Sequence, residues 1–250
     1  MNLERFKITK AAEIERLRGQ ALPPPLGTAR PRFIAPRAEG ERIRVVAEYK
    51  RASPSRGVIC EHHTPEAIAE VYTRGGASAI SVLTEEVYFK GHLDFLRRIS
   101  ARTALPLLRK DFIFDEAQVH ETAATPVSAL LLIVALTPDA AHLRGLRALA
   151  EAFGMTAVVE VFDERELDVA RDAGASVIQV NNRNLETLVV DASVTRRLVS
   201  CRLDGECWIA ASGYETRAQI DALANYDAVL VGTALMASAN PCEALKELTR

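Results

Sequence analysis

The residues that could do chemistry in this chain follow, or interrupt, short apolar runs. One run leads into Glu48 and Lys50, two residues apart, and another leads into Lys110. Glu160 lies inside a third run, between two valines. In a strand, residues two apart point to the same face, and a buried charge needs a partner of opposite charge. Carboxylates paired with ammonium groups at strand ends suit general acid–base catalysis.

Glu160 is the most informative of these residues. Its flanking valines predict a buried position, where a carboxylate is penalised unless a cation answers its charge. Lys50 and Lys110 are the candidates for that cation, because alternate strands of a closed barrel contribute to shared layers of side chains. For Glu48 and Lys50 taken alone, an exposed ion pair at a strand end explains the spacing equally well.

Amide, guanidinium and small residues follow three later apolar runs. They are Asn181 and Arg183 after one run, Ser212-Gly213 after the next, and Gly232-Thr233 after the last. Small residues leave backbone N–H groups uncovered, and the loops after the seventh and eighth strands form the usual phosphate site of a barrel. The sequence therefore predicts a phosphate site here; the alternative is that both glycines only serve tight turns.

The elements that must position these side chains are predicted by an alternation of apolar runs and helical patterns. The runs are Val45–Ala47, Ala79–Leu83, Leu105–Leu108, Ala129–Val134, Ala157–Val161, Val177–Val180, Trp208–Ala211 and Ala228–Val231. Continuous apolar runs are what a parallel sheet covered on both faces requires. Helix-start signals at Thr64-Pro65, Thr137-Pro138 and Asp163 lie between them. Strands that alternate with helices in this number predict an α/β fold, a (β/α)8 TIM barrel.

The competing architecture is a doubly wound open sheet. Such a sheet usually carries a glycine-rich phosphate loop after its first strand, whereas the first run here leads into ASPSRG. Residues 3–19 have helical period, and residues 22–42 are rich in proline. We therefore expect one domain, with an N-terminal helix and proline-rich arm over residues 1–44 and a barrel over residues 45–250.

Composition and charge narrow the class of partner. The chain has 250 residues and a formal net charge of -2, with its Arg and Lys scattered along the sequence. We therefore expect no nucleic acid and no membrane as partner, and no apolar run approaches the length of a spanning helix. The four cysteines show no CxxC spacing, and we expect reduced thiols in the cytoplasm. We expect His62-His63 to lie in a solvated loop and not to bind a metal.

Several segments, taken together and in this order, resemble indole-3-glycerol phosphate synthases. They are AEYKRASPSRG, SVLTEEVYFKG, PLLRKDFIF, ALLLIVA, VVEVFDERELDVARDAGA, VNNRNL and DAVLVGTALM. The resemblance implies a barrel enzyme, monomeric or weakly associated, that acts on a small phosphorylated molecule without a metal or organic cofactor. The implied reaction closes the ring of 1-(2-carboxyphenylamino)-1-deoxyribulose 5-phosphate with loss of carbon dioxide and water, a step of tryptophan synthesis.

The resemblance also implies roles for individual residues. Lys110 would be the general acid of the condensation, and Glu160 the base or electrostatic partner of the dehydration. Glu48 and Lys50 would share proton transfer and orient the substrate, and which lysine acts in which step stays open. Asn181, which we count with the catalytic residues, and Arg183 would hold the hydroxyl and carboxylate of the substrate. Phe89 and Phe112 would flank its aromatic ring. The phosphate and nearby polar groups would be bound by Ser53, Ser212, Gly213, Gly232 and Thr233.

The sequence departs from the family pattern at several positions. Ala211 stands where the family commonly has a glutamate, and Gln179 where it often has a glycine. The main acid–base residues are intact, so we expect activity, with the rate and substrate orientation affected by the missing carboxylate. Two alternatives stay open: a related phosphate-binding barrel such as a phosphoribosyl isomerase, and a non-catalytic barrel that binds substrate.

Overall fold

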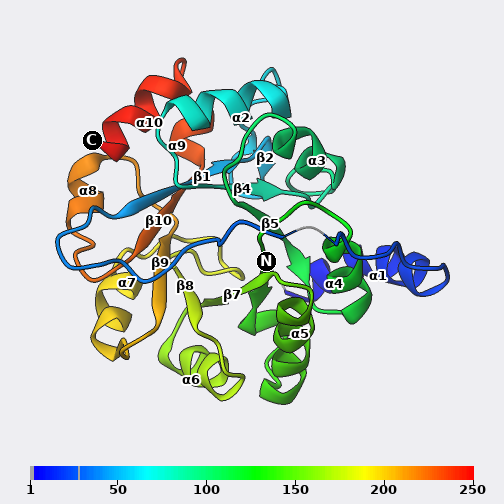
Figure 1. The fold of residues 1–250 in the computed structure, drawn as a ribbon. Helices are drawn as coiled ribbons and strands as arrows, with labels where there is room; N and C mark the ends of the chain where they lie inside the picture. The colour runs from blue at the N-terminus through cyan, green and yellow to red at the C-terminus, as the bar shows by residue number, and fades with distance from the viewer. Residues whose placement is uncertain (1–2, 28) are drawn as a thin grey trace.

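The chain folds into a closed barrel of parallel strands, with helices around it (Figure 1). A computed structural model describes residues 3–27 and 29–250. The barrel strands follow one another in chain order: β1 (Arg44–Tyr49), β4 (Ala79–Leu83), β5 (Leu107–Ile113), β6 (Ala129–Ile133), β7 (Thr156–Val161), β8 (Val177–Asn181), β9 (Cys207–Ala211) and β10 (Ala228–Val231). Strand β10 pairs with β1 and closes the ring. The predicted (β/α)8 fold is confirmed, and each predicted apolar run contributes to one of these strands.

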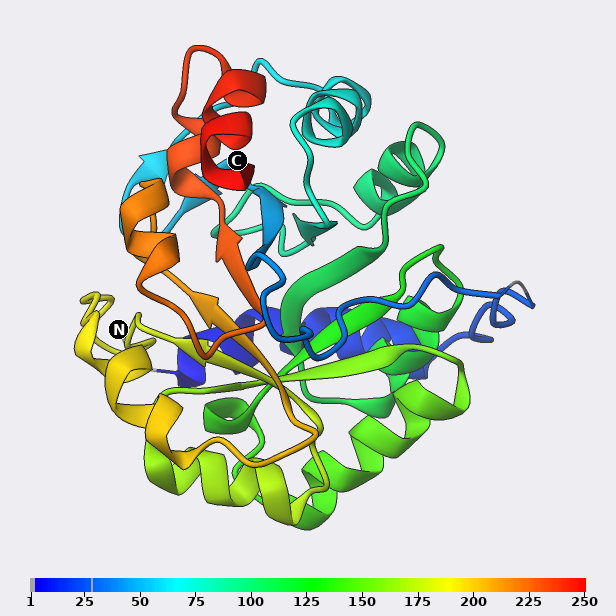
Figure 2. The same cartoon turned by 60° about the vertical axis from the view of Figure 1, so that its left-hand side comes forward.

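Helices connect successive strands and cover the outside of the barrel (Figure 2). They are α2 (Pro65–Arg74), α3 (Asp94–Ser100), α4 (Glu116–Ala123), α5 (Ala140–Ala152), α6 (Glu164–Asp172), α7 (Ser193–Leu198), α8 (Arg217–Asp221), α9 (Thr233–Met236) and α10 (Pro241–Thr249), with short 3-10 turns at η1 (Val134–Leu136) and η2 (Val199–Cys201). The N-terminal helix α1 (Glu4–Arg18) precedes the barrel, as residues 3–19 predicted. Over the described residues, no helix is long and apolar enough to cross a membrane.

Side-chain caps begin the helices at two of the three predicted starts. The side chains of Thr64 and Asp163 accept backbone N–H groups at the starts of α2 and α6. The start expected at Thr137 is wrong, because Asp139 caps α5 instead. The Thr137 hydroxyl donates to the carbonyl of Ile133 at 2.9 Å and so holds the turn after β6.

Side chains fill the barrel in layers to which alternate strands contribute. From the N-terminal end upward, the strand registers and their stagger give Ala79, Ala129, Val177 and Ala228, and then Val46, Leu108, Val158 and Ile209. Above them lies a supporting layer of Ser81, Leu131, Gln179 and Leu230. Next comes what we call the charged layer: Glu48, Lys110, Glu160 and Ala211. The layer that carries three charges therefore lies above a partly polar layer and, below that, two layers of apolar side chains.

Strand β5 differs most from its prediction, because it continues through charged residues. Lys110 points into the barrel, whereas Arg109 and Asp111 point to its outer side and are buried there. The pairing of β5 with β6 shifts register between Arg109 and Ile113. A short hairpin of β2 (Ala52–Ser53) and β3 (Gly57–Val58) also forms after β1.

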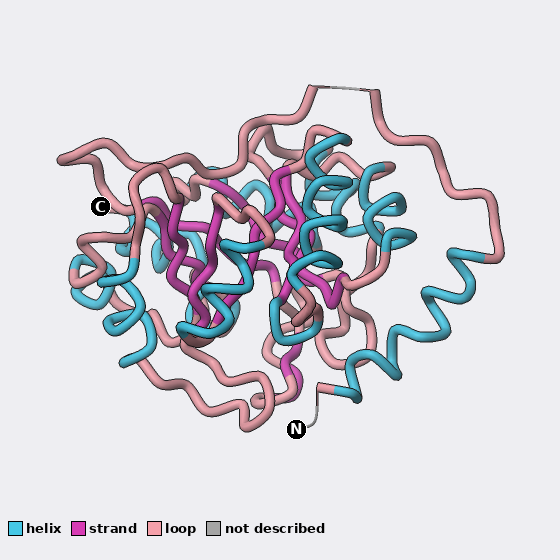
Figure 3. Tube along the Cα trace, turned by 90° about the horizontal axis from the view of Figure 1, so that it is seen from below, coloured by secondary structure: helices cyan, strands magenta, loops and turns pink. Residues whose placement is uncertain are grey.

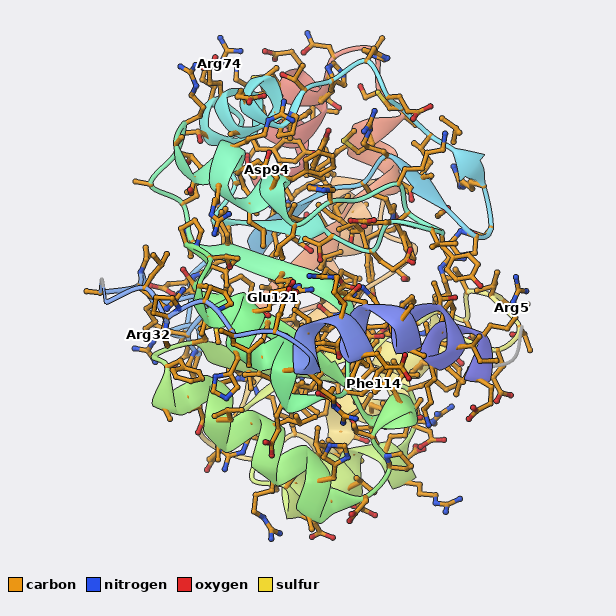
Figure 4. The ribbon with its side chains drawn as sticks, turned by 90° about the vertical axis from the view of Figure 1, so that its right-hand side faces the viewer. Arg5, Arg32, Arg74, Asp94, Phe114 and Glu121 are labelled. Carbon is orange, nitrogen blue, oxygen red and sulfur yellow. The ribbon has the colours of Figure 1, made fainter. Side chains whose placement is uncertain are left out.

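Helix α1 lies across β5 and beside α4 (Figure 4), and in Figure 3 it is the helix that follows the marked N-terminus. The buried ammonium group of Lys10 lies 2.7 Å from one carboxylate oxygen of Asp111, and Arg109 lies 3.2 Å from the other. Although burial favours the neutral form of Asp111, these two cations hold its pKa below the ordinary value. Phe6 stacks on Phe112 with 4.0 Å between ring centroids. A buried charge cluster and an aromatic contact thus hold α1 on the barrel.

The segment between α1 and β1 crosses the N-terminal end of the barrel. Arg30 donates to backbone carbonyls after α4, including that of Thr125 at 2.8 Å. Phe33 and Ile34 are buried in the same cluster as the lowest barrel layers. The boundary at residue 45 between arm and barrel stays a prediction, and residues 1, 2 and 28 of the predicted N-terminal unit lie outside the described residues.

We expect Lys10→Met to lower the free energy of unfolding by about 3 kcal/mol, because it leaves the buried Asp111 carboxylate with one cation fewer. Urea unfolding at pH 7 measures the change. Lys246→Met is the matched control, since Lys246 pairs with Glu243 on the surface at 2.8 Å, and should shift the free energy by less than about 0.5 kcal/mol. Equal effects of the two substitutions would contradict the role of Lys10 in docking α1.

Candidate active site

A cavity of about 320 Å³ opens at the C-terminal end of the barrel, above the charged layer. Every predicted site residue lines it: Glu48, Lys50, Ser53, Phe89, Lys110, Phe112, Glu160, Asn181, Arg183, Ser212, Gly213, Gly232 and Thr233. The fold thus brings together residues that are spread over most of the chain. Their chemical roles stay predictions, and the geometry below shows what each can do.

Two ion pairs lie in the upper part of the barrel. Nζ of Lys110 lies 3.2 Å from Oε2 of Glu160, and Nζ of Lys50 lies 2.6 Å from Oε1 of Glu48. Both carboxylates are almost fully buried, whereas both ammonium groups reach the cavity. Of the two candidate cations, Lys110 therefore contacts Glu160, whereas Lys50 pairs with Glu48, two residues before it in the chain.

Amide groups complete the surroundings of Glu160. Asn181 Nδ2 donates to Oε1 of Glu160 at 2.9 Å, and Gln179 Nε2 donates to Oε2. Hydrogen bonds to a carboxylate favour its ionised form and offset the cost of burial. Asn181 Oδ1 also accepts the backbone N–H of Arg183 at 3.0 Å, so one amide links Glu160 to the loop after β8.

The register shift in β5 lies at Lys110. An extra residue in one strand of a pair bends that strand and re-aims its side chains, and such irregularities are frequent beside active sites. Here the shift lies between Arg109 and Ile113 and therefore includes Lys110, Asp111 and Phe112, the three residues of β5 that line the cavity. The sequence carried no signal for it beyond the unusual density of charge in the strand.

A buried carboxylate shapes the loop that carries Phe89. Glu85 accepts the backbone N–H groups of Val87, Tyr88 and Phe89 at 2.7 to 3.1 Å. Burial raises the pKa of Glu85 above its ordinary value, although these hydrogen bonds act in the opposite direction. The ring of Phe89 lies 6.1 Å from that of Phe112 across the cavity wall. Glu85 therefore positions an aromatic wall of the site, a role that sequence reasoning missed.

Phe6 is a further lining residue that sequence reasoning missed. In the sequence it was only one of the apolar positions with helical spacing in α1. Its stacking on Phe112 brings the N-terminal helix to the cavity, so the same contact docks α1 and extends the aromatic wall. A contact between residues so distant in sequence leaves no local pattern from which it could be predicted.

Two guanidinium groups, those of Arg183 and Arg56, belong to residues that line the cavity, and Glu215 lies 3.8 Å from Arg56. Arg183 donates to the carbonyl of Leu188 at 2.8 Å and lies 3.4 Å from the hydroxyl of Ser55 in the loop between β2 and β3. Partial burial, and then repulsion from Arg56, lower the pKa of Arg183, while Glu48 acts in the opposite direction. A guanidinium group under such repulsion gains from an anionic ligand, and its planar fork suits a carboxylate or a phosphate.

Small residues at the ends of β9 and β10 leave room for their neighbours. Gly213 has a φ of +89° and Ser212 a φ of +70°, so the chain turns sharply at the cavity wall. A Cβ on Gly232 would collide with the carboxylate of Glu48 and lie 3.0 Å from its Cβ. Gly232 is thus required by the buried Glu48 and does more than serve a tight turn.

The two adjacent histidines lie away from this cavity. His62 is exposed and His63 is half-buried, as expected for a loop residue pair. The fold does bring Cys60 to them, with its Sγ 3.3 Å from Nδ1 of His62, and all three potential ligand atoms lie within 4.8 Å of one another. This proximity was missed, since the sequence showed no recognisable ligand spacing.

A family model for indole-3-glycerol phosphate synthase matches residues 29–248. The chain belongs to the indole-3-glycerol phosphate synthase family. The indole-3-glycerol phosphate synthase of Dehalococcoides mccartyi strain CBDB1 is 45% identical over 222 residues, which cover 86% of this chain and 85% of that protein. The synthase of Chloroherpeton thalassium is 41% identical over 248 residues, 94% of this chain and 95% of the relative.

Solved structures of other proteins resemble this member of the indole-3-glycerol phosphate synthase family in fold. The 3-hexulose-6-phosphate synthase of Salmonella typhimurium has a TM-score of 0.64 at 16% identity, covering 83% of this chain and 97% of that one. KGPDC from Streptococcus mutans has a TM-score of 0.61 at 9% identity, covering 83% and 96%. At these identities the likeness shows the barrel fold alone.

The two departures from the family pattern lie next to the reactive groups. Ala211 occupies the fourth position of the charged layer, pairs in register with Asn181 and leaves that position without a charge. Gln179 lies in the supporting layer and contacts Glu160. In this member of the family, the charges of the charged layer therefore come from Glu48, Lys110 and Glu160.

We expect Gly232→Ala to displace the Glu48 carboxylate and to lower kcat/KM for the family's reaction by about 100-fold, since misplacement of a catalytic group by about 1 Å can have that effect. Gly145→Ala in α5 is the matched control, because a Cβ there meets nothing within 4 Å. It should keep full activity. Full activity of Gly232→Ala in a steady-state assay would show that Glu48 does not depend on this glycine.

Glu166, at the start of α6, shares a second, smaller hollow with Glu160 and Asn181. Its carboxylate accepts the backbone N–H of Phe162 at 2.8 Å. Burial raises its pKa to about 7, with repulsion from Asp163 and Glu160 adding to the effect. Because the folded state keeps a proton that the unfolded chain has lost, Glu166 lowers stability as the pH rises from about 4.5 through about 7.

We therefore expect Glu166→Gln to remove about 2 kcal/mol of pH dependence from the free energy of unfolding, a value that allows for partial screening by solvent. The measurement compares urea unfolding of wild type and variant at pH 5 and pH 7.5. The free energy of unfolding of the variant, relative to that of wild type, should be higher at pH 7.5 than at pH 5. A constant difference between them at both pH values would contradict the raised pKa of Glu166.

Proposed function

We propose that this chain performs the reaction for which its family is named, the closure of an indole ring on 1-(2-carboxyphenylamino)-1-deoxyribulose 5-phosphate. The observation that carries the proposal is the contact of Lys110 with Glu160 in the floor of the cavity. An acid and a base held 3.2 Å apart, with apolar layers beneath them, suit a sequence of proton transfers to and from one substrate.

Lys110 is proposed as the acid of the first step. The ring carbon that bears the carboxylate attacks the ketone carbon, and Lys110 protonates the ketone oxygen as it becomes a hydroxyl. The carboxylate then leaves as carbon dioxide, and its bonding electrons return to the ring. An ammonium group that reaches the cavity while its partner carboxylate is buried is placed to give a proton to substrate.

Glu160 is proposed as the base of the dehydration. The new hydroxyl leaves as water after it takes a proton, and a base removes a proton from the ring system to form the indole double bond. The contacts of Glu160 support this role, because Asn181 and Lys110 keep its carboxylate oxygens at fixed positions. Glu48 and Lys50 form a second pair at 2.6 Å, from which the leaving hydroxyl can be protonated. Which lysine acts in which step stays open.

The other residues are proposed to hold the substrate. Arg183 fits the substrate carboxylate, because an anion there would offset the repulsion between Arg183 and Arg56. Phe89 and Phe112 flank the aromatic ring from the wall that Glu85 and Phe6 support. The phosphate would lie against the loops after β1, β9 and β10, which contribute Ser53, Ser212, Gly213, Gly232 and Thr233. Backbone N–H groups at the start of α9 add donors at that end.

Ala211 provides the one specific reason to keep a second candidate, a barrel that binds the substrate without converting it. Its side chain leaves a position of the charged layer without a proton carrier. Against this, both ion pairs needed for the proposed steps are present. Turnover by the wild-type protein separates the two candidates directly.

We expect purified wild type to convert the carboxyphenylamino sugar phosphate without added metal, followed by the fluorescence of the indole product. Lys110→Met and Glu160→Gln should each lower kcat by about 10²- to 10⁴-fold, the range for loss of general acid–base catalysis. Lys246→Met, on the surface, is the control and should match wild type. Tight binding of the substrate by wild type without any conversion would favour the binding barrel. Undiminished turnover of both site variants would sink the assigned roles.

A further inference from the structure

Gln179 contacts the reactive carboxylate from beneath. It points into the barrel from β8, within the supporting layer, and has no exposed surface. Its Nε2 donates to Oε2 of Glu160, the oxygen that also accepts from Lys110. Because the side chain has no surface open to the cavity, it reaches bound substrate only through Glu160.

The other end of the Gln179 amide has no partner. Its Oε1 is buried and accepts no hydrogen bond. A buried carbonyl oxygen without a donor is destabilising, and an apolar side chain of the same size would avoid that cost. The neighbours Leu131 and Leu230 in the supporting layer are apolar. Packing alone therefore does not account for an amide at this position.

The orientation of the amide matches an ionised Glu160. If the oxygen and nitrogen of Gln179 exchanged places, an acceptor would face the carboxylate, and the two would repel. Asn181 donates to the opposite oxygen of Glu160 at 2.9 Å. Both carboxylate oxygens are thus bound by amide groups that do not titrate, and Lys110 adds the one charge-assisted contact.

Charged groups face Glu160 from several elements. Lys110 on β5 is its contacting cation, and Glu166 on α6 is close enough for mutual repulsion. Glu48 shares the charged layer from β1, with Lys50 bound to it. Strand β9 contributes Ala211, which has no charge. Repulsion from Glu166 thus opposes a negative charge on Glu160, and the amide donors offset that repulsion.

We infer that Gln179 is a positioning residue for the proposed reaction: it holds the Glu160 carboxylate aimed at the cavity from the layer below. The inference rests on the proposed role of Glu160. The free Oε1 has a use in the same cycle, because an amide without a second hydrogen bond can turn. When Glu160 has taken a proton, Gln179 can accept that proton's hydrogen bond in place of donating its own.

Gln179→Met tests the inference, because it keeps the length of the side chain and removes the donor. Loss of a hydrogen bond to a charged group should lower kcat about tenfold and leave KM within about twofold. Ser81→Ala is the matched control, since Ser81 lies in the same layer and its buried hydroxyl also has no partner. It should leave both constants unchanged.

A readout independent of turnover accompanies the kinetics. In protein labelled with ¹³C at glutamate carboxyls, the Glu160 signal is assigned by its absence in Glu160→Gln and compared between wild type and Gln179→Met at one pH. Its chemical shift should change in Gln179→Met, because the carboxylate loses a hydrogen-bond donor, and should stay the same in Ser81→Ala.

The outcomes distinguish the inference from the proposed function. An unchanged Glu160 signal and an unchanged kcat in Gln179→Met would overturn the inference, even with an active wild type. A changed Glu160 signal in a protein that never converts substrate would support the contact and contradict the proposed function. Failure of both Gln179→Met and Gln179→Leu to fold would show that the amide is needed for stability, and would also overturn the inference.

Discussion

The buried carboxylate of Glu160 is the constraint on which the site depends. A negative charge above apolar layers is costly, and it persists only where donors and a cation surround it. Lys110 provides the cation at 3.2 Å, while Asn181 and Gln179 bind the two oxygens. The same contacts that make the charge tolerable also make it usable, since they hold an acid and a base together in the floor of the cavity.

The fold delivers this arrangement through alternation and stagger. Successive residues of β5 point to opposite sides, so Lys110 enters the barrel while Arg109 and Asp111 are buried against α1 and α4. The outward pair holds α1, and α1 in turn brings Phe6 to the cavity. Stagger between strands places Glu48, Lys110 and Glu160 at one height, although they come from strands far apart in the chain. Docking of the N-terminal helix and construction of the site are therefore parts of one network around β5.

Much of this could be predicted from residue order, and the rest could not for physical reasons. Apolar runs bounded by polar ends were enough for the barrel and for the residues at its mouth, because strand polarity decides which end carries chemistry. The pairing of Lys110 with Glu160, and not of Lys50, depends on stagger, which has no local signal. Phe6 and Glu85 act through packing and backbone contacts. Gln179 could be noticed only as a departure from a family pattern, and its contact with Glu160 required the fold.

The most direct test of this account is a double-mutant cycle on kcat with Lys110→Met, Glu160→Gln and the two combined. If the two residues act as one unit, removing the second adds little, so the double variant should be within about threefold of the slower single variant. If the two losses multiply, the residues act independently. That result would contradict the central claim that the Lys110–Glu160 contact organises the site.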